Sequence, residues 1–170
     1  MKKIFFTCLL PLFAASVSAQ SPYVSIKDPN HPEQHIFNGI ITKYALQNDT
    51  TYKWYNSSQN SYKPAEPIIA SLQSAVGKVQ FIVFGGTWCE DTQFILPKFF
   101  KLQEQSGIPD AAVSLFAVDR SKKTIGGITN AFKITNVPTI IVMKDGKETG
   151  RIVEYGKTGK WDQELADLLK

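Results

Sequence analysis

The spacing of hydrophobic residues divides the chain into an irregular first part and a regular second part. From about Pro67 onward, short continuous apolar runs alternate with segments that carry apolar residues at helical spacing. Continuous runs are typical of strands buried on both faces of a sheet, and helical spacing is typical of amphipathic helices. The second part therefore predicts an α/β domain that covers residues 67–170.

Strands and helices alternate in this regular part. Strands are expected at 79–84, 112–118, 139–143 and 149–153, and helices at 67–76, 89–105, 127–132 and 161–169. Asp145-Gly146 stands between the last two strands and predicts a hairpin, because Asp-Gly is a strong signal for a tight turn. Strand–helix alternation implies parallel pairing, and the hairpin adds antiparallel strands. We expect a mixed sheet with helices on both faces.

Residues 20–66 form a polar and aromatic N-terminal extension with a weaker pattern. Five of its residues recur at helical spacing and predict one amphipathic helix; they are Ile36, Ile40, Ile41, Tyr44 and Ala45. Four aromatic residues follow at Tyr52, Trp54, Tyr55 and Tyr62. These aromatic side chains either form a binding platform or pack the extension onto the main domain.

Residues 1–19 have the composition of a secretory signal peptide. Lys2 and Lys3 give a basic start, residues 4–17 are mostly apolar, and Val17-Ser18-Ala19 matches a small-residue cleavage pattern. The apolar run is shorter than the ~20 residues that a membrane-spanning helix needs, which argues against a membrane anchor. We therefore expect an exported protein, periplasmic or secreted, with no membrane contact after cleavage.

Cleavage near Gln20 would leave a mildly charged chain with one cysteine. The formal net charge falls from +4 to +2 without Lys2 and Lys3, and the charged residues are interspersed. Such a balance argues against a nucleic acid or an anionic membrane as partner. Cys8 would leave with the signal, so Cys89 would be the single thiol of a chain without an internal disulfide, which we expect to be a monomer.

Cys89 stands where a predicted strand meets a predicted helix, in Gly85-Gly86-Thr87-Trp88-Cys89-Glu90-Asp91-Thr92. The unpaired N–H groups and the dipole of a helix N-terminus favour a thiolate at this position. Glu90 and Asp91 oppose ionisation. Thr92 stands where a Cys-x-x-Cys pair would have its second sulfur. The residues therefore predict half of a thiol–disulfide site.

A second loop is expected beside this cysteine. The strands at 79–84 and 112–118 should run parallel, so their carboxyl ends meet at one edge of the sheet, where ligands bind in open α/β sheets. Three basic residues follow the second strand; they are Arg120, Lys122 and Lys123. Their side chains either approach the thiol and favour its ionised form or belong to a solvated loop.

Several features between Pro67 and Lys170 occur together in one order. Trp88-Cys89 heads a helix, Pro97 lies inside that helix, and Val137-Pro138-Thr139 leads into a strand. With the Asp-Gly hairpin and a glycine after the last strand, this part of the chain resembles the thioredoxin superfamily. The resemblance implies a thioredoxin-like fold in which Pro138 follows a cis peptide bond and lies beside Cys89.

The chain departs from the family pattern at two positions. Thr92 replaces the second redox cysteine, and Val83 falls where the family has a buried acid that serves the second thiol. Without a second cysteine, release of a mixed disulfide needs an outside thiol. The Thr92 hydroxyl can still hydrogen-bond the sulfur of Cys89.

Three functions compete on this basis. In the first, Cys89 exchanges disulfides with protein partners or a small-molecule thiol, Trp88 and Thr92 shape its surroundings, and Val137 and Pro138 present the substrate. In the second, the fold is a redox-inactive module that binds peptides or proteins. In the third, a lone thiolate reduces peroxide, although Gly86 replaces the hydroxyl residue that peroxiredoxins have there.

No cofactor and no metal are expected. His31 and His35 have the spacing of metal ligands on a helix, but no third histidine and no cysteine lies near them in sequence. Two ligands make a poor metal site.

Overall fold

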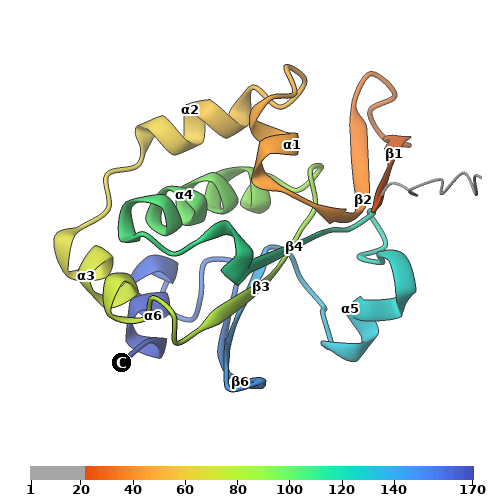
Figure 1. The fold of residues 1–170 in the computed structure, drawn as a ribbon. Helices are drawn as coiled ribbons and strands as arrows, with labels where there is room; N and C mark the ends of the chain where they lie inside the picture. The colour runs from red at the N-terminus through yellow and green to blue at the C-terminus, as the bar shows by residue number, and fades with distance from the viewer. Residues whose placement is uncertain (1–21) are drawn as a thin grey trace, which may run out of the picture.

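The computed structural model describes residues 22–170, and six strands in this part form one mixed sheet (Figure 1). In order across the sheet they are β1 (Tyr23–Lys27), β2 (His35–Ile41), β4 (Val113–Ala117), β3 (Gln80–Gly85), β5 (Thr139–Lys144) and β6 (Lys147–Val153). The helices are α1 (Lys43–Gln47), α2 (Trp54–Ser61), α3 (Glu66–Ser74), α4 (Glu90–Ser106), α5 (Ile128–Ala131) and α6 (Trp161–Leu168). The predicted signal peptide, including Cys8, lies outside the described residues.

The regular part of the chain folds as its pattern predicts. β3 and β4 pair in parallel, and β5 is antiparallel to both β3 and β6. The β5–β6 turn contains Asp145 and Gly146 with φ angles of 51° and 74°, the left-handed conformation that a tight hairpin turn requires. The mixed α/β sheet of a thioredoxin-like fold is therefore confirmed.

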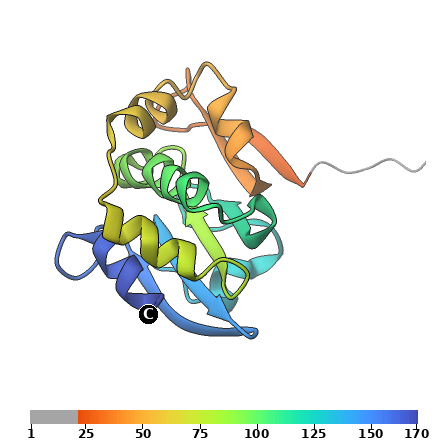
Figure 2. The same cartoon turned by 60° about the vertical axis from the view of Figure 1, so that its left-hand side comes forward.

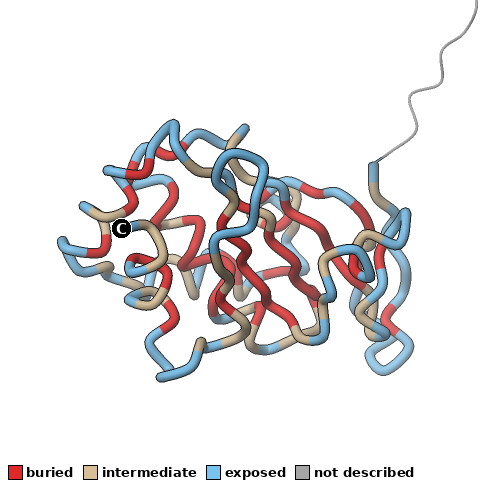
Figure 3. Tube along the Cα trace, turned by 90° about the horizontal axis from the view of Figure 1, so that it is seen from below, coloured by how far each residue is buried: buried red, intermediate tan, exposed pale blue. Residues whose placement is uncertain are grey.

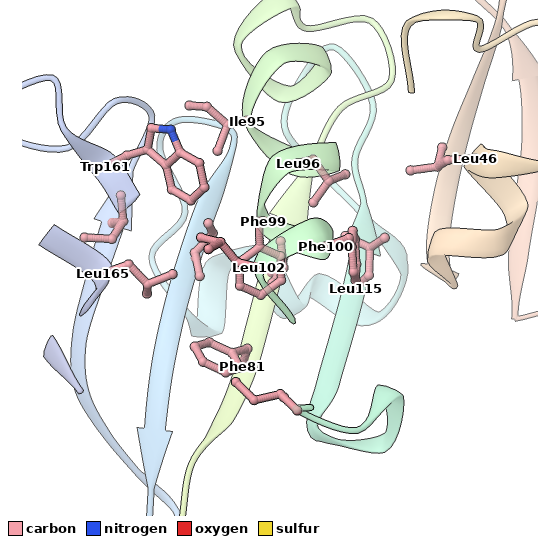
Figure 4. Close-up of a cluster of buried hydrophobic side chains, with 14 of the residues drawn as sticks. Leu46, Phe81, Ile95, Leu96, Phe99, Phe100, Leu102, Leu115, Trp161 and Leu165 are labelled. Atoms are coloured by element: carbon pink, nitrogen blue, oxygen red, sulfur yellow. The ribbon is translucent and has the colours of Figure 1, made fainter. Parts of the chain in front are cut away.

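Helices cover the two faces of the sheet unequally. The helices α1, α2, α3, α4 and α6 contribute to the core on one face, where α4 lies between α2 and α3 (Figure 2). Their larger core includes Phe81 of β3 against Phe99 of α4, with ring centroids 5.4 Å apart (Figure 4). On the other face, the short α5 and the segment around it pack on a smaller cluster formed by Phe84, Phe116, Val118, Val137 and Ile141.

The helix predicted over 36–45 is wrong for most of its length. Residues 35–41 form β2, which pairs with both β1 and β4, and only Tyr44 and Ala45 lie in a helix, α1. Ile36 and Ile40 are four residues apart, a separation that places side chains on one face of a strand as well as of a helix. Phe37 and Ile41 point to the opposite face, where they join the larger core.

The extension shares its core with the rest of the chain. β1 and β2 belong to the same sheet as the strands beyond residue 67. Tyr52 and Tyr55 are buried, and Tyr62 packs against Trp161 and donates a hydrogen bond to Asp162 Oδ2 at 2.7 Å. These aromatic side chains thus pack the extension onto the domain. Figure 3 shows the buried residues running along the central strands.

Candidate functional site

Cys89 lies at the head of α4, at the sheet edge where β3 and β4 both end. Val118 N–H donates a hydrogen bond to Gly85 O at 3.0 Å, which joins the two loops that follow these strands. Cys89 itself is the N-cap residue of α4, with an extended backbone, and carries a free, half-buried thiol. The structure therefore places the thiol beside the loop after β4, as the strand order predicts.

Two glycines allow the loop before Cys89 to pack closely. A Cβ on Gly85 would lie 2.9 Å from Thr92 Cγ2, and one on Gly86 would lie 2.7 Å from the indole of Trp88. Only glycine leaves room for such contacts. Gly85-Gly86 therefore lets Thr92 and Trp88 approach the backbone on either side of the thiol.

Val137 and Pro138 lie directly beside the thiol. The Cys89 Sγ–H group donates a hydrogen bond to Val137 O at 3.2 Å, and the Val137–Pro138 peptide bond is cis. Glu154 N–H donates to Pro138 O at 2.8 Å, which links this segment to the residues after β6. A segment far along the chain thus forms one wall of the thiol site.

Thr92 has a different partner from the one expected. Its side chain is buried, and Oγ1 accepts a hydrogen bond from Gly86 N–H at 3.2 Å. Between residues 22 and 170, no hydrogen bond joins this hydroxyl to the sulfur of Cys89. Thr92 therefore holds the glycine loop in place, and its effect on the thiol is indirect.

Trp88 forms the side of the site that faces the loop after β4. Its Nε1–H donates a hydrogen bond to Val118 O at 3.0 Å, and the guanidinium carbon of Arg120 lies 5.3 Å from its ring centroid. Trp88 also packs against the smaller core cluster. The indole is thus held at its edge by a carbonyl and over its face by a cation.

The basic residues after β4 differ from one another. Arg120 forms a two-bond ion pair with Asp28, so its charge is neutralised by a carboxylate from the extension. The Arg120 guanidinium holds the pKa of Asp28 at about 2. Lys123 has an exposed side chain, and that of Lys122 is half-buried. Sequence reasoning missed Asp28, since nothing local marks it as the partner of a residue 92 positions away.

Two exposed aromatic residues contact each other near the head of α4; Phe94 lies in that helix and Tyr155 follows β6. Phe94 and Tyr155 are 47% and 38% exposed, and their ring centroids are 5.7 Å apart. Burial raises the pKa of Tyr155, and the nearby Asp91 carboxylate raises it further. Neither aromatic residue was expected at the site.

The positions that depart from the redox pattern are packed as ordinary core. Val83, where the resemblance places a buried acid, is fully buried within the larger cluster.

His31 lies in the loop before β2 and His35 begins that strand, so the two do not share a helix. Residues 22–170 contain no group of three or more potential metal ligands, and no helix among them is long and apolar enough to cross a membrane.

Comparison with known proteins identifies the family. The thioredoxin family model matches residues 37–167, a span that begins within β2 and therefore inside the extension. Thioredoxin from Coprinus comatus is 33% identical over 82 residues, which cover 48% of this chain and 74% of that protein. Thioredoxin-1 from Saccharomyces cerevisiae is 28% identical over 86 residues, covering 49% and 78%. The chain belongs to the thioredoxin family.

Proposed function

We propose that this chain is an exported thioredoxin-like protein that exchanges disulfides through the single thiol of Cys89. The observation that carries the proposal is the placement of a half-buried thiol at the head of α4, with Val137 O 3.2 Å from the sulfur. A substrate disulfide can reach the sulfur there while its flanking backbone lies along Val137 and Pro138. Family membership supports protein thiols or disulfides as the substrate class.

The exchange proceeds in two balanced steps. The Cys89 thiolate attacks one sulfur of a substrate disulfide, the S–S bond breaks, and the other sulfur leaves as a thiolate that takes a proton from water. An outside thiolate, from another substrate cysteine or from a small-molecule thiol, then attacks the mixed disulfide and releases Cys89. Thr92 offers no thiol for this second step, and its hydroxyl is engaged with Gly86.

A redox-inactive module that binds a peptide is the second candidate, and an exposed aromatic pair favours it. The exposed pair of Phe94 and Tyr155 would then serve as a surface for binding a peptide.

Mixed-disulfide trapping distinguishes the two candidates. The protein is mixed with a disulfide-linked peptide, and adducts are detected by intact mass, with Cys89→Ser as the blank. We expect an adduct with one peptide that persists until cysteine or dithiothreitol is added. No adduct, together with a thiol that resists iodoacetamide up to pH 9, would contradict exchange and support the binding module.

Export has its own test. N-terminal sequencing of the protein recovered from outside the cytoplasm should give a chain that begins at or near Gln20. A chain that retains Met1, or that carries lipid on Cys8, would contradict both export and the single-thiol argument.

A further inference from the structure

Asp28 is a carboxylate with almost no exposed surface at the end of β1. It is 1% exposed, and each of its oxygens is engaged. Arg120 Nε–H donates to Oδ1 at 2.6 Å and Nη2–H donates to Oδ2 at 2.7 Å, while Asn30 N–H donates to Oδ1 at 2.9 Å. A two-bond pair of this kind fixes the plane of the guanidinium as well as its position.

The fixed guanidinium is also the group that lies over Trp88. Arg120 follows β4, and its Cζ is 5.3 Å from the Trp88 ring centroid, within the range of a cation–π contact. Trp88 immediately precedes Cys89. A chain of direct contacts therefore runs from Asp28, in the extension, through Arg120 to the residue next to the thiol.

Two further hydrogen bonds tie the β1–β2 hairpin to the same loops. Asn38 Nδ2–H donates to Lys123 O at 2.9 Å, in the loop that carries Arg120. Thr87, in the loop that carries Trp88, donates a hydrogen bond from its Oγ1–H to His35 O at 3.3 Å. The hairpin thus contacts both loops that shape one side of the thiol site.

We propose that Asp28 is a positioning residue for the thiol site: it holds Arg120 against Trp88, and the fixed indole shapes the surface on which a disulfide meets Cys89. The kinetic part of this inference rests on the proposed exchange function, whereas the positioning of the indole does not.

Because Asp28 and Arg120 form a neutral pair, removing one partner or the other distinguishes an effect on the position of the Trp88 indole from an effect of charge on Cys89. Removing Asp28 leaves an unpaired cation beside Trp88, and removing the guanidinium leaves an unpaired carboxylate. The two changes have opposite electrostatic effects on Cys89, which also has Glu90, Asp91 and Tyr155 near it. Their effect on the position of the indole is the same.

The test compares Asp28→Asn, Arg120→Met and Arg120→Lys with the control Lys123→Met, which removes an exposed cation from the same loop. The first readout is the indole N–H signals of the ¹⁵N-labelled protein, with that of Trp88 identified by its loss in Trp88→Phe. We expect Asp28→Asn and Arg120→Met to move the Trp88 signal and to leave those of Trp54 and Trp161 in place. Arg120→Lys should move the Trp88 signal as well, because the single ammonium of lysine cannot form the two parallel hydrogen bonds that the guanidinium makes to Asp28.

The second readout is the rate of mixed-disulfide formation with a peptide disulfide. We expect both Asp28→Asn and Arg120→Met to lower it roughly tenfold, within the loss that an ångström-scale misplacement can cause. Lys123→Met should match the wild type in both indole spectrum and peptide rate.

Two results would overturn the inference. One is a Trp88 signal that Asp28→Asn and the Arg120 variants leave unmoved. The other is a peptide rate that rises in Asp28→Asn and falls in Arg120→Met, which would assign the effect to charge. If the wild type forms no mixed disulfide, the proposed function fails, and the indole signals alone decide the positioning. If Asp28→Asn does not fold, Arg120→Lys carries the same test at a partly exposed side chain.

Discussion

The two sides of Cys89 are built differently. On one side, Trp88 is held by Val118 O at 3.0 Å and by Arg120, which a buried carboxylate fixes in turn. On the other side, the rings of Phe94 and Tyr155 are tilted by 48° to each other and remain 47% and 38% exposed, and Lys98 Nζ lies 2.8 Å from the Phe94 ring centroid. Hydrogen bonds hold the first side, whereas the second offers apolar surface to the solvent.

This difference suggests a division of labour around the thiol. The side formed by Trp88 and Arg120, called the fixed side, loses little conformational freedom when a substrate binds, so it favours a defined approach to the sulfur. An exposed aromatic surface contributes apolar contact area and tolerates varied partners. The fixed side should therefore control the geometry of attack, and the open side should control which peptides bind.

The largest effect on stability is expected from Arg120→Met, on the fixed side. The change leaves the Asp28 carboxylate buried without its partner. We expect the free energy of unfolding to fall by about 2 kcal/mol at pH 7, less than for a fully buried pair because Arg120 is partly exposed. Urea unfolding measures this free energy. A loss no larger than that of Lys123→Met would contradict the role of the Asp28–Arg120 pair in holding the Trp88 side.

The same pair makes stability depend on pH. Arg120 lowers the pKa of Asp28 in the folded chain from 3.8 to about 2. The stabilisation from Asp28 is therefore present above about pH 4 and is lost as the pH falls towards 2. In Arg120→Met this part of the acid-induced loss should disappear, because the unpaired carboxylate no longer prefers the charged form. Urea unfolding of both proteins between pH 2 and pH 5 measures the difference.

A smaller effect on stability is expected from Thr92→Cys, which places a second sulfur beside the Gly85-Gly86 loop. The variant should cycle between dithiol and disulfide and reduce insulin catalytically, although slowly, because Val83 supplies no proton acceptor. It should also lose about 1 kcal/mol of stability, because Gly86 N–H loses its hydroxyl acceptor. Equal insulin reduction by the wild type and the variant, with Cys89→Ser as the blank, would show that Thr92 does not limit turnover.

The regular part of the fold was predictable because its signals are local. β3 is a continuous apolar run, and Asp145-Gly146 marks the β5–β6 hairpin without reference to distant residues. β2 was mistaken for a helix because a separation of four between Ile36 and Ile40 fits both structures. β1 has Val24 and Ile26 exposed, so it lacks the buried pattern of the other strands.

The site was predictable to a lesser degree. Cys89, Trp88 and Val137-Pro138 could be placed because strand order and family resemblance fix where loops meet. The Asp28–Arg120 pair joins residues 92 positions apart, and no pattern in the sequence selects one acid among fifteen for that role. Phe94 follows the apolar spacing of α4, yet it lies at the border of the buried stripe and faces solvent.

The smallest effect on stability is expected from Phe94→Ala, on the open side. The ring is half exposed, but its face carries the Lys98 ammonium, whose Nζ lies 2.8 Å from the ring centroid, so removal of the ring should lower the free energy of unfolding by less than about 1 kcal/mol. Its loss should matter for binding. A peptide that covers about 50 Å² of this ring gains about 1 kcal/mol, so the exchange rate with a disulfide peptide carrying an apolar neighbour should fall about fivefold.

A peptide with polar neighbours gains little from the ring, so its rate should stay within about twofold of the wild type. Val76→Ala is the matched control, since Val76 is 40% exposed and lies beyond the end of α3, away from the thiol. If Phe94→Ala slows both peptides equally, Phe94 acts on the thiol rather than on the choice of peptide. The open side would then resemble the fixed side, and the division of labour between them would be wrong.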